Sequence, residues 1–383
     1  MPGLCLAALV SPLIATDLPS VNHFDAMGRA LELAWNGWGR VSPNPLVGAV
    51  VLQGDELVGE GFHAEFGERH AEVVALEAAG SRAAGSTVLV TLEPCNHRGK
   101  QPPCTAALIK AGVRQVIAAV ADPNPEAGGG AAALIAQGIK VEIGLRAEEA
   151  SRQNAAFLHR FTEAERPFVA LKLATTLDGK IADHAGRSRW ISGAKAREFV
   201  HWLRAGYDAI GIGGYTARTD DASLTVRGNI EPRVPPRRVV FDRLGDLPAS
   251  LNLVRTAREI PTLLLTTPQA SPAKIDALES AGVEVYQSAS LSAAIALLGH
   301  QGVGSLLIEG GGRLAGALLA EGLVDRYYWI QSPVWLGDDG IPAIEGIPGS
   351  RLMEADRWQV VERRSLGEDT LLVVDRAGCL PES

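Results

Sequence analysis

The hydrophobic positions of the first 146 residues switch repeatedly between helical and strand spacing. Apolar residues three and four positions apart predict helices over residues 24–36, 71–79, 105–113 and 129–139. Short apolar or alternating runs between them predict strands over residues 47–52, 56–62, 86–93, 115–124 and 140–145. This order predicts an α/β domain over residues 23–146, built in three layers (α/β/α) around a mixed or parallel sheet.

A charged stretch with helical character follows over residues 147–166 and ends at Pro167. We expect a linker helix here and place the domain boundary after it. The remainder, residues 167–383, alternates strands and helices again and predicts a second α/β domain. Its patterns include a helix over 196–209, a strand and loop over 209–227, and strands over 237–242, 262–267, 283–288 and 326–333.

Composition narrows the class of protein. A chain of 383 residues is too long for one typical core, which supports two domains. The net charge of −8 argues against a general nucleic-acid or membrane-surface binder, so we expect a small-molecule partner. Cys5 and Cys379 lie at opposite ends, so no disulfide framework is predicted and a reducing cytoplasm fits. For residues 1–22 we expect a loosely packed extension, with a cleaved signal as the alternative.

The candidate chemistry is concentrated between residues 70 and 104. His70 and Glu72 begin a predicted helix, while Cys95 and Cys104 each follow a proline. One imidazole and two thiolates are typical of a catalytic zinc site, whose fourth position holds a water with its pKa lowered toward about 7. We therefore expect His70, Cys95 and Cys104 to bind one zinc ion and Glu72 to transfer protons.

This spacing matches the zinc-deaminase signature H-x-E followed by P-C-x-x-C, except that eight residues separate the two cysteines. With the sequence TLEPCNHRGKQPPC over residues 91–104, the chain resembles the bacterial riboflavin-biosynthesis family of bifunctional deaminase/reductases. The resemblance implies a cytidine-deaminase-like first domain in which the inter-cysteine loop forms part of the substrate pocket. The substrate contacts that it implies there are Asn44, His63, His97 and Lys100.

The second half carries further motifs of this family, LK-A-T-LDGKIA, S-W-IS, TARTDDASLTVR and IEGGG, so the resemblance covers about residues 24–375. It implies a dihydrofolate-reductase-like domain that binds NADPH in a fold that is not Rossmann. A buried strand that ends in three glycines and enters a helix can hold a phosphate on bare backbone N–H groups, although such glycines also serve tight turns. The implied cofactor contacts are Ala174, Trp190, Thr216, Asp220, Gly311, Gly312, Arg313, Leu314, Ala315, Gly316 and Ala317.

The second domain also contains candidate substrate ligands. The resemblance implies contacts from Ser188, Leu224, Arg227 and Glu309. Arg204 and Arg227 suit a ribose 5-phosphate, because a guanidinium holds phosphate in a fork. Lys172 is a candidate to hold or polarise the sugar, and Asp220 to deliver a proton. Arg243 replaces a small polar residue that the family often has near the cofactor, and it contacts a 2′-phosphate or faces solvent.

These patterns predict a bifunctional enzyme of riboflavin synthesis, a zinc-dependent pyrimidine deaminase (a hydrolase) joined to an NADPH-dependent reductase (an oxidoreductase). The first domain would deaminate 2,5-diamino-6-(5-phosphoribosylamino)pyrimidin-4(3H)-one. The second would reduce the ribosyl group of 5-amino-6-(5-phosphoribosylamino)uracil to ribityl. Two alternatives remain open, a nucleic-acid base deaminase and a zinc-stabilised ligand-binding protein with an inactive second domain. We expect a cytoplasmic homo-oligomer, dimer or tetramer, without nucleic-acid or membrane partners.

Overall fold

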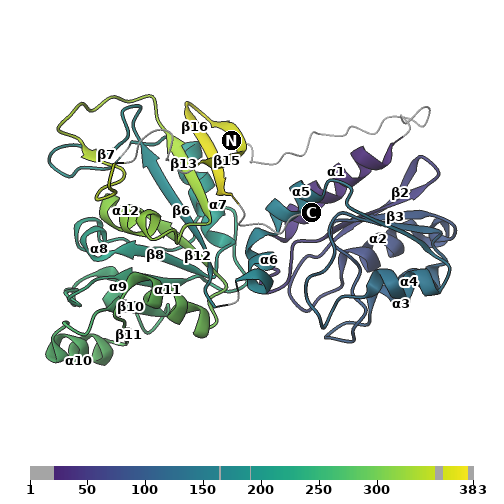
Figure 1. The fold of residues 1–383 in the computed structure, drawn as a ribbon, viewed down its shortest axis with the longest axis horizontal. Helices are drawn as coiled ribbons and strands as arrows, with labels where there is room; N and C mark the ends of the chain where they lie inside the picture. Colours follow the sequence, from purple (N-terminus) through teal and green to yellow (C-terminus); the bar gives the residue numbers. More distant parts are fainter. Residues whose placement is uncertain (1–20, 164, 190, 350–356, 378–383) are drawn as a thin grey trace.

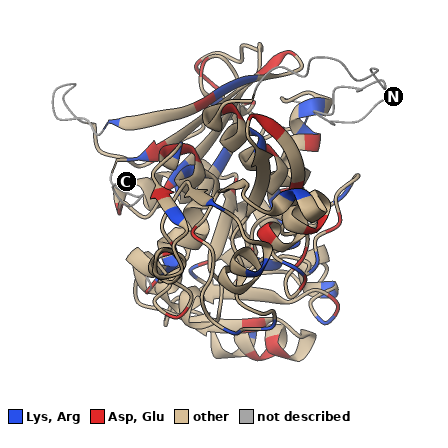
Figure 2. Cartoon of the chain, turned by 90° about the vertical axis from the view of Figure 1, so that its right-hand side faces the viewer, with Lys and Arg blue, Asp and Glu red and all other residues tan. Residues whose placement is uncertain are grey.

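The computed structural model describes residues 21–163, 165–189, 191–349 and 357–377. Figure 1 shows two α/β domains side by side along the long axis, with helices α5 (Ala147–Gln153) and α6 (Ala155–Thr162) between them. Acidic and basic residues are interspersed over both domains (Figure 2). None of the helices in the described ranges combines the length and hydropathy that a bilayer span requires.

The first domain is built on a five-stranded sheet of order β2-β1-β3-β4-β5. Strand β1 pairs antiparallel with β2 and β3, whereas β3, β4 and β5 run parallel, so the sheet is mixed. Its elements are α1 (His23–Ala34), η1 (Trp35–Gly37), β1 (Gly48–Gln53), β2 (Glu56–Phe62), α2 (Ala71–Ala79), η2 (Gly80–Ala83), β3 (Thr87–Val90), α3 (Cys104–Ala111), β4 (Gln115–Ala118), α4 (Gly130–Ala136) and β5 (Lys140–Ile143).

Two hydrophobic cores lie on opposite faces of this sheet. On one face Val50 and Leu89 pack against Met27 and other apolar residues of α1. On the other face the strands pack against α2, α3 and α4, and Leu108 of α3 is fully buried there. Alternate residues of each strand point to opposite faces, so both faces are apolar and both are covered. The predicted three-layer α/β/α arrangement is confirmed.

The linker consists of two helices rather than the single helix that the pattern predicted. The break falls at Asn154, which is 5% exposed. Its side chain accepts a hydrogen bond from the Leu46 backbone N–H at 2.8 Å and donates one to the Leu46 carbonyl at 2.9 Å. Ala150 of α5 belongs to a first-domain core, whereas Ala155 of α6 packs in a second-domain core. The linker therefore passes from one domain to the other at Asn154.

The second domain is built on a nine-stranded sheet of order β11-β10-β9-β8-β12-β6-β13-β16-β15. Strands from β11 to β13 in this order run parallel, and the hairpin β15–β16 extends the sheet antiparallel. The elements are β6 (Phe168–Thr175), β7 (Lys180–Ala182), α7 (Ala194–Ala205), β8 (Ala209–Gly213), α8 (Gly214–Asp220), β9 (Arg237–Phe241), α9 (Asn252–Arg255), β10 (Thr262–Thr266), α10 (Pro272–Ala281), β11 (Glu284–Gln287), α11 (Leu291–His300), β12 (Ser305–Glu309), α12 (Gly312–Ala320), β13 (Arg326–Gln331), β14 (Ile341–Pro342), β15 (Trp358–Leu366) and β16 (Asp369–Arg376).

Helices cover both faces of this larger sheet. In β6, Val169 and Leu171 pack in the core beneath α11 and α12, while Phe168 and Ala170 pack toward α7 on the other face. The predicted alternation of strands and helices is confirmed. One expectation for residues 209–227 was wrong: the stretch after β8 contains a short helix, α8, rather than only a loop.

Candidate active sites in the two domains

The metal-ligand candidates of the first domain come together at one end of its sheet. His70 is the N-cap residue of α2, Cys104 is the first residue of α3, and Cys95 lies in the loop after β3. His70 Nδ1 lies 3.2 Å from Cys104 Sγ and 3.5 Å from Cys95 Sγ. Among the described residues, these three form the group whose ligand atoms all lie within 4.8 Å of one another.

The donor set fits zinc. Ligand atoms bound to one tetrahedral zinc ion at about 2.0–2.3 Å lie roughly 3.5–3.8 Å apart, close to the separations between His70 and the two sulfurs. The hydrogen bond from Cys104, together with those from His70 and the Cys104 backbone, lowers the pKa of Cys95 to about 4 despite its burial. The hydrogen bond to Cys95 and burial raise the pKa of Cys104, because both favour its neutral thiol, and the negative charges of Glu72 and Cys95 add to this effect. A divalent cation bound between the sulfurs would favour both cysteines as thiolates.

Glu72 lies beside this group, near the N-terminus of α2. Its side chain is 3% exposed and borders the same cavity as His70 and Cys95. Burial raises the pKa of Glu72, and the nearby charge of His70 only partly offsets this effect. A carboxyl group with a raised pKa that faces the ligand group can both accept and donate a proton near neutral pH.

The cavity has a volume of about 260 Å³, and its wall contains all four first-domain substrate candidates. Asn44 donates a hydrogen bond to His63 Nε2 at 3.1 Å, and His63 Nδ1 donates to the Arg69 carbonyl at 3.1 Å. Burial lowers the pKa of His63, consistent with this neutral tautomer. His97 and Lys100 reach the cavity from the inter-cysteine loop.

Several other residues of the cavity wall were not predicted from the sequence. Asp122 and Asn124 follow β4, whose carboxyl end lies beside that of β3 in the parallel part of the sheet. Their signal in the sequence was a polar turn after a buried strand, a place where open α/β sheets bind ligands. Phe66 and Phe157 also border the cavity, Phe157 from the linker helix α6.

In the second domain the buried carboxylate of Glu309 is central. It ends β12 and is 7% exposed. Arg204 binds both of its oxygens, with Nε at 2.5 Å and Nη2 at 3.1 Å, and also donates to the Thr225 carbonyl at 2.9 Å. Lys172 Nζ lies 3.6 Å from Glu309. The guanidinium of Arg204 therefore already holds a carboxylate and a carbonyl, and its predicted contact with a phosphate stays a prediction.

The glycine run after β12 combines two structural reasons for glycine. Gly310 and Gly311 have φ angles of 71° and 83°, which favour glycine. Gly312 and Gly316 face backbone: added Cβ atoms would lie 2.5 Å from the Pro342 carbonyl oxygen and 1.8 Å from the Glu345 carbonyl oxygen. The run therefore forms a tight turn into α12 that packs closely on residues 342–345. The predicted phosphate site at this turn stays a prediction.

The remaining second-domain candidates surround the ends of the central strands. Thr216 of α8 lies next to the glycine turn, since a Cβ on Gly311 would be 3.0 Å from its Oγ1. Arg227 is exposed, and its backbone N–H donates to His201 Nδ1 at 3.2 Å. Arg243 is exposed after β9. The other candidates are Ala174 in β6, Ser188 after β7, Asp220 at the end of α8, Leu224 with φ 49°, and Arg313, Leu314, Ala315 and Ala317 in α12. Trp190 lies outside the described residues.

Comparisons with known proteins agree with this geometry. Residues 21–120 match the family described as the cytidine and deoxycytidylate deaminase zinc-binding region, and residues 167–372 match the RibD C-terminal domain. The riboflavin biosynthesis protein RibD of Synechocystis sp. is 41% identical over 330 residues, which cover 85% of this chain and 89% of that protein.

Solved structures give the same result. RibD of Acinetobacter baumannii (form 1) superposes with a TM-score of 0.79 at 36% identity, over 92% of this chain and 98% of that one. A Thermotoga maritima protein described as a diaminohydroxyphosphoribosylaminopyrimidine deaminase/5-amino-6-(5-phosphoribosylamino)uracil reductase has a TM-score of 0.79 and 35% identity, with the same coverage.

A zinc-binding deaminase domain joined to a reductase domain defines a bifunctional deaminase/reductase. The chain belongs to the RibD family and is a deaminase and reductase of riboflavin biosynthesis. This membership decides against the two alternatives, a nucleic-acid base deaminase and a ligand-binding protein with an inactive second domain.

Proposed function

We propose that the first domain hydrolyses the amine from 2,5-diamino-6-(5-phosphoribosylamino)pyrimidin-4(3H)-one. The second domain then reduces the ribosyl group of the product, 5-amino-6-(5-phosphoribosylamino)uracil, to ribityl with NADPH. The observation that carries the first half is the three-membered ligand group with buried Glu72 beside it, in one cavity. The Thermotoga relative is named for these two substrates, which supports the assignment.

In the deamination, His70, Cys95 and Cys104 would hold zinc, and Glu72 would carry protons. Zinc in a three-ligand site lowers the pKa of bound water toward about 7. Glu72 takes a proton from the attacking water and gives one to the departing amine, so that a C–O bond replaces the C–N bond and ammonia leaves. Its raised pKa suits this exchange.

The wall of the cavity suggests how the substrate lies. A volume of about 260 Å³ is near the lower limit of small-molecule sites and accommodates the pyrimidine ring better than the whole phosphoribosyl compound. Asn44 borders the cavity and keeps its amide oxygen for the ring, while His63 holds Asn44 in place through the hydrogen bond on Nε2. Lys100 is exposed on the loop, so the phosphate can lie beside its ammonium group while the ring enters the cavity.

In the reductase domain, NADPH supplies the hydride for C1 of the ring-opened ribose. We assign the cofactor to Ala174, Thr216, Asp220 and the turn from Gly311 to Ala317, with Trp190 as a further contact. Arg227 is the better phosphate ligand of the two candidate arginines, because Arg204 is held by Glu309. Lys172 and Glu309 present buried charges beside the expected position of the sugar, and Ser188 and Leu224 complete the substrate contacts.

Two assays on the purified full chain test this function. Ammonia should be released from the diaminopyrimidine substrate without NADPH. NADPH oxidation, followed by absorbance, should require the deaminated compound. A chain that releases no ammonia from this substrate would refute the first assignment, and NADPH oxidation that does not depend on the deaminated compound would refute the second. We also propose that the protein assembles as a homo-oligomer, and a monomer by light scattering would contradict this.

A further inference from the structure

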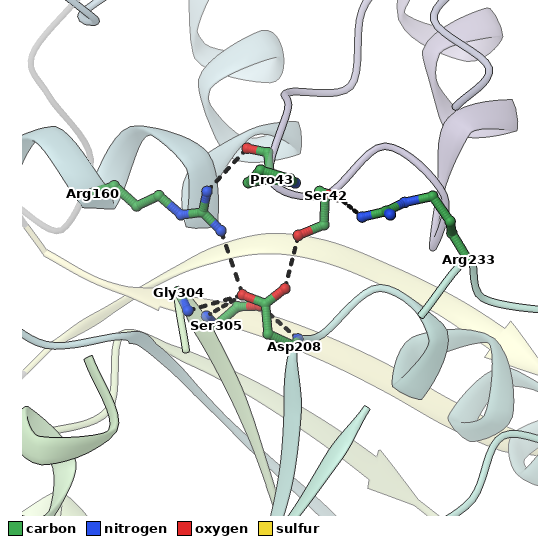
Figure 3. A network of polar contacts seen from close by, with 7 residues as sticks. All are labelled: Ser42, Pro43, Arg160, Asp208, Arg233, Gly304 and Ser305. Carbon is green, nitrogen blue, oxygen red and sulfur yellow. Dashed lines mark hydrogen bonds and ion pairs between the residues drawn. The ribbon is translucent and has the colours of Figure 1, made fainter. Parts of the chain in front are cut away.

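An arginine of the second domain reaches the deaminase domain. Arg233 lies between α8 and β9, and its side chain donates hydrogen bonds to the Arg40 carbonyl at 3.2 Å from Nε and to the Ser42 carbonyl at 2.6 Å from Nη2. Its backbone N–H donates to the Gly39 carbonyl at 3.0 Å. Three hydrogen bonds thus join one residue of the second domain to residues 39–42 of the first (Figure 3 shows the side-chain bond to Ser42).

The same segment is held from a second direction. Asp208 accepts a hydrogen bond from Ser42 Oγ at 2.8 Å, and its carboxylate also accepts the backbone N–H groups of Gly304 and Ser305 at 2.9 and 3.0 Å. Arg160 donates to the Pro43 carbonyl at 3.0 Å. Figure 3 shows Asp208 bonded to Ser42 and Arg160 bonded to Pro43, with the Gly304 and Ser305 backbone at the Asp208 carboxylate. The second domain and the linker helix α6 thereby fix the backbone that immediately precedes Asn44.

This segment leads directly into the wall of the deaminase cavity. Asn44 borders the cavity and holds His63 by the hydrogen bond described above. The Arg40 carbonyl that accepts from Arg233 also accepts the Phe66 backbone N–H at 3.2 Å. The Phe66 ring lies 4.9 Å from the Arg233 guanidinium and 3.9 Å from Lys100 Nζ. Arg233 therefore binds the backbone just before Asn44 and the carbonyl that holds the Phe66 backbone.

We propose that Arg233 is a positioning residue for deamination, supplied by the reductase domain. This inference rests on the proposed deaminase substrate. The guanidinium of Arg233 donates hydrogen bonds to two carbonyls in a fixed geometry and packs against Phe66. These contacts hold Asn44, Phe66 and Lys100 in position to contact the substrate. Removing Arg233 leaves the Arg40 and Ser42 carbonyls without these donors. Small displacements of substrate-contacting residues can reduce turnover strongly.

Docking of the two domains does not depend on Arg233 alone. The Trp38 ring stacks on Trp202 of α7 with centroids 4.8 Å apart, and Trp38 Nε1 donates to the Trp202 carbonyl at 2.7 Å. Ser42 and Pro43 also keep their own bonds to Asp208 and Arg160. An Arg233 variant should therefore stay folded and docked, and only the deaminase cavity should change.

The test compares Arg233→Ala and Arg233→Lys with the control Arg237→Ala. Arg237 belongs to the same domain and donates to the Gln301 carbonyl at 2.9 Å and to Glu284 at 3.1 Å, both within the second domain. For each protein, KM and kcat for ammonia release, zinc content, and KM and kcat for NADPH oxidation on the deaminated compound are measured.

We expect Arg233→Ala to lower kcat/KM for ammonia release about tenfold, mainly by raising KM, because the displaced residues contact substrate rather than the metal. Arg233→Lys should recover part of the loss, since it restores the charge but not the fork. Zinc content and the reductase constants should not change, and Arg237→Ala should leave both activities at the wild-type values.

Three outcomes would overturn the positioning role. They are unchanged ammonia release in Arg233→Ala, a parallel loss of both activities, or an equal deaminase loss in Arg237→Ala. A wild-type chain that does not react with the diaminopyrimidine would instead refute the proposed substrate. Normal wild-type turnover beside an unaffected Arg233→Ala variant would refute the positioning role alone.

Discussion

Replacing Arg204 with leucine should destabilise the second domain by about 3 kcal/mol. Arg204 binds both oxygens of Glu309, which is 7% exposed. Removing one partner of a buried ion pair typically costs about 3–5 kcal/mol, because the remaining charge has lost its partner. Lys172 stays 3.6 Å from Glu309 and partly compensates, so we expect a value at the lower end of this range.

The pKa of Glu309 gives a similar value for the free energy that the Arg204 ion pair contributes. Burial by itself would raise it, but the charges of Arg204 and Lys172 and the Arg204 hydrogen bonds outweigh burial and hold the pKa at about 2, against an ordinary value of 4.5. At about 1.4 kcal/mol per pKa unit, this difference corresponds to about 3 kcal/mol. Because the folded-state pKa is depressed, this stabilisation is fully present above about pH 4.5 and is lost as the pH falls toward 2.

Thermal unfolding at neutral pH and down the acid limb measures this effect. For a domain of this size about 3 kcal/mol lowers Tm by roughly 6–12 °C. The Arg204→Leu variant should also lose stability less steeply than wild type below pH 4.5. Arg237→Leu is the matched control, since Arg237 pairs with the largely exposed Glu284 and such pairs contribute about 0–1 kcal/mol. A Tm for Arg204→Leu equal to that of the control would refute the reasoning.

Three further variants test separate parts of the structure. Glu72→Gln should slow ammonia release about 10²–10⁴-fold while metal analysis still finds zinc, because the ligands remain; a normal rate would rule out its proton role. Arg227→Ala should raise the reductase KM about tenfold with a smaller change in kcat, as measured by NADPH oxidation, and an unchanged KM would count against a phosphate contact. Asn154→Ala removes both hydrogen bonds to Leu46 and should destabilise the first domain by about 1–3 kcal/mol in a urea titration; a loss below about 0.5 kcal/mol would contradict this accounting.

The local spacing of hydrophobic residues was sufficient to predict most helices and strands of the fold. The predicted helix over 71–79 and strand over 56–62 have the same bounds as α2 and β2, because each is fixed by its own hydrophobic spacing. The break between α5 and α6 was not predictable, because Asn154 is held by Leu46, 108 residues earlier. The β15–β16 hairpin was also missed, since β15 is largely exposed and its pattern gives little hydrophobic signal.

In the candidate sites, too, some residues could be predicted from the sequence and others depend on contacts between distant segments. His70, Glu72, Cys95 and Cys104 were identifiable because the order of these residue types along the chain is characteristic of the chemistry, and the fold brings them together. Pairing of Arg204 with Glu309 depends on the packing of α7 against β12 and could not be predicted from spacing. The same is true of Arg233, whose contacts lie in the other domain.

Metal removal tests the central claim most directly. Purified protein should contain about one zinc per chain, and chelation should abolish ammonia release while NADPH oxidation on the deaminated compound continues. Restoring zinc should restore ammonia release. A metal-free chain that deaminates at the full rate would contradict the proposed role of His70, Cys95 and Cys104.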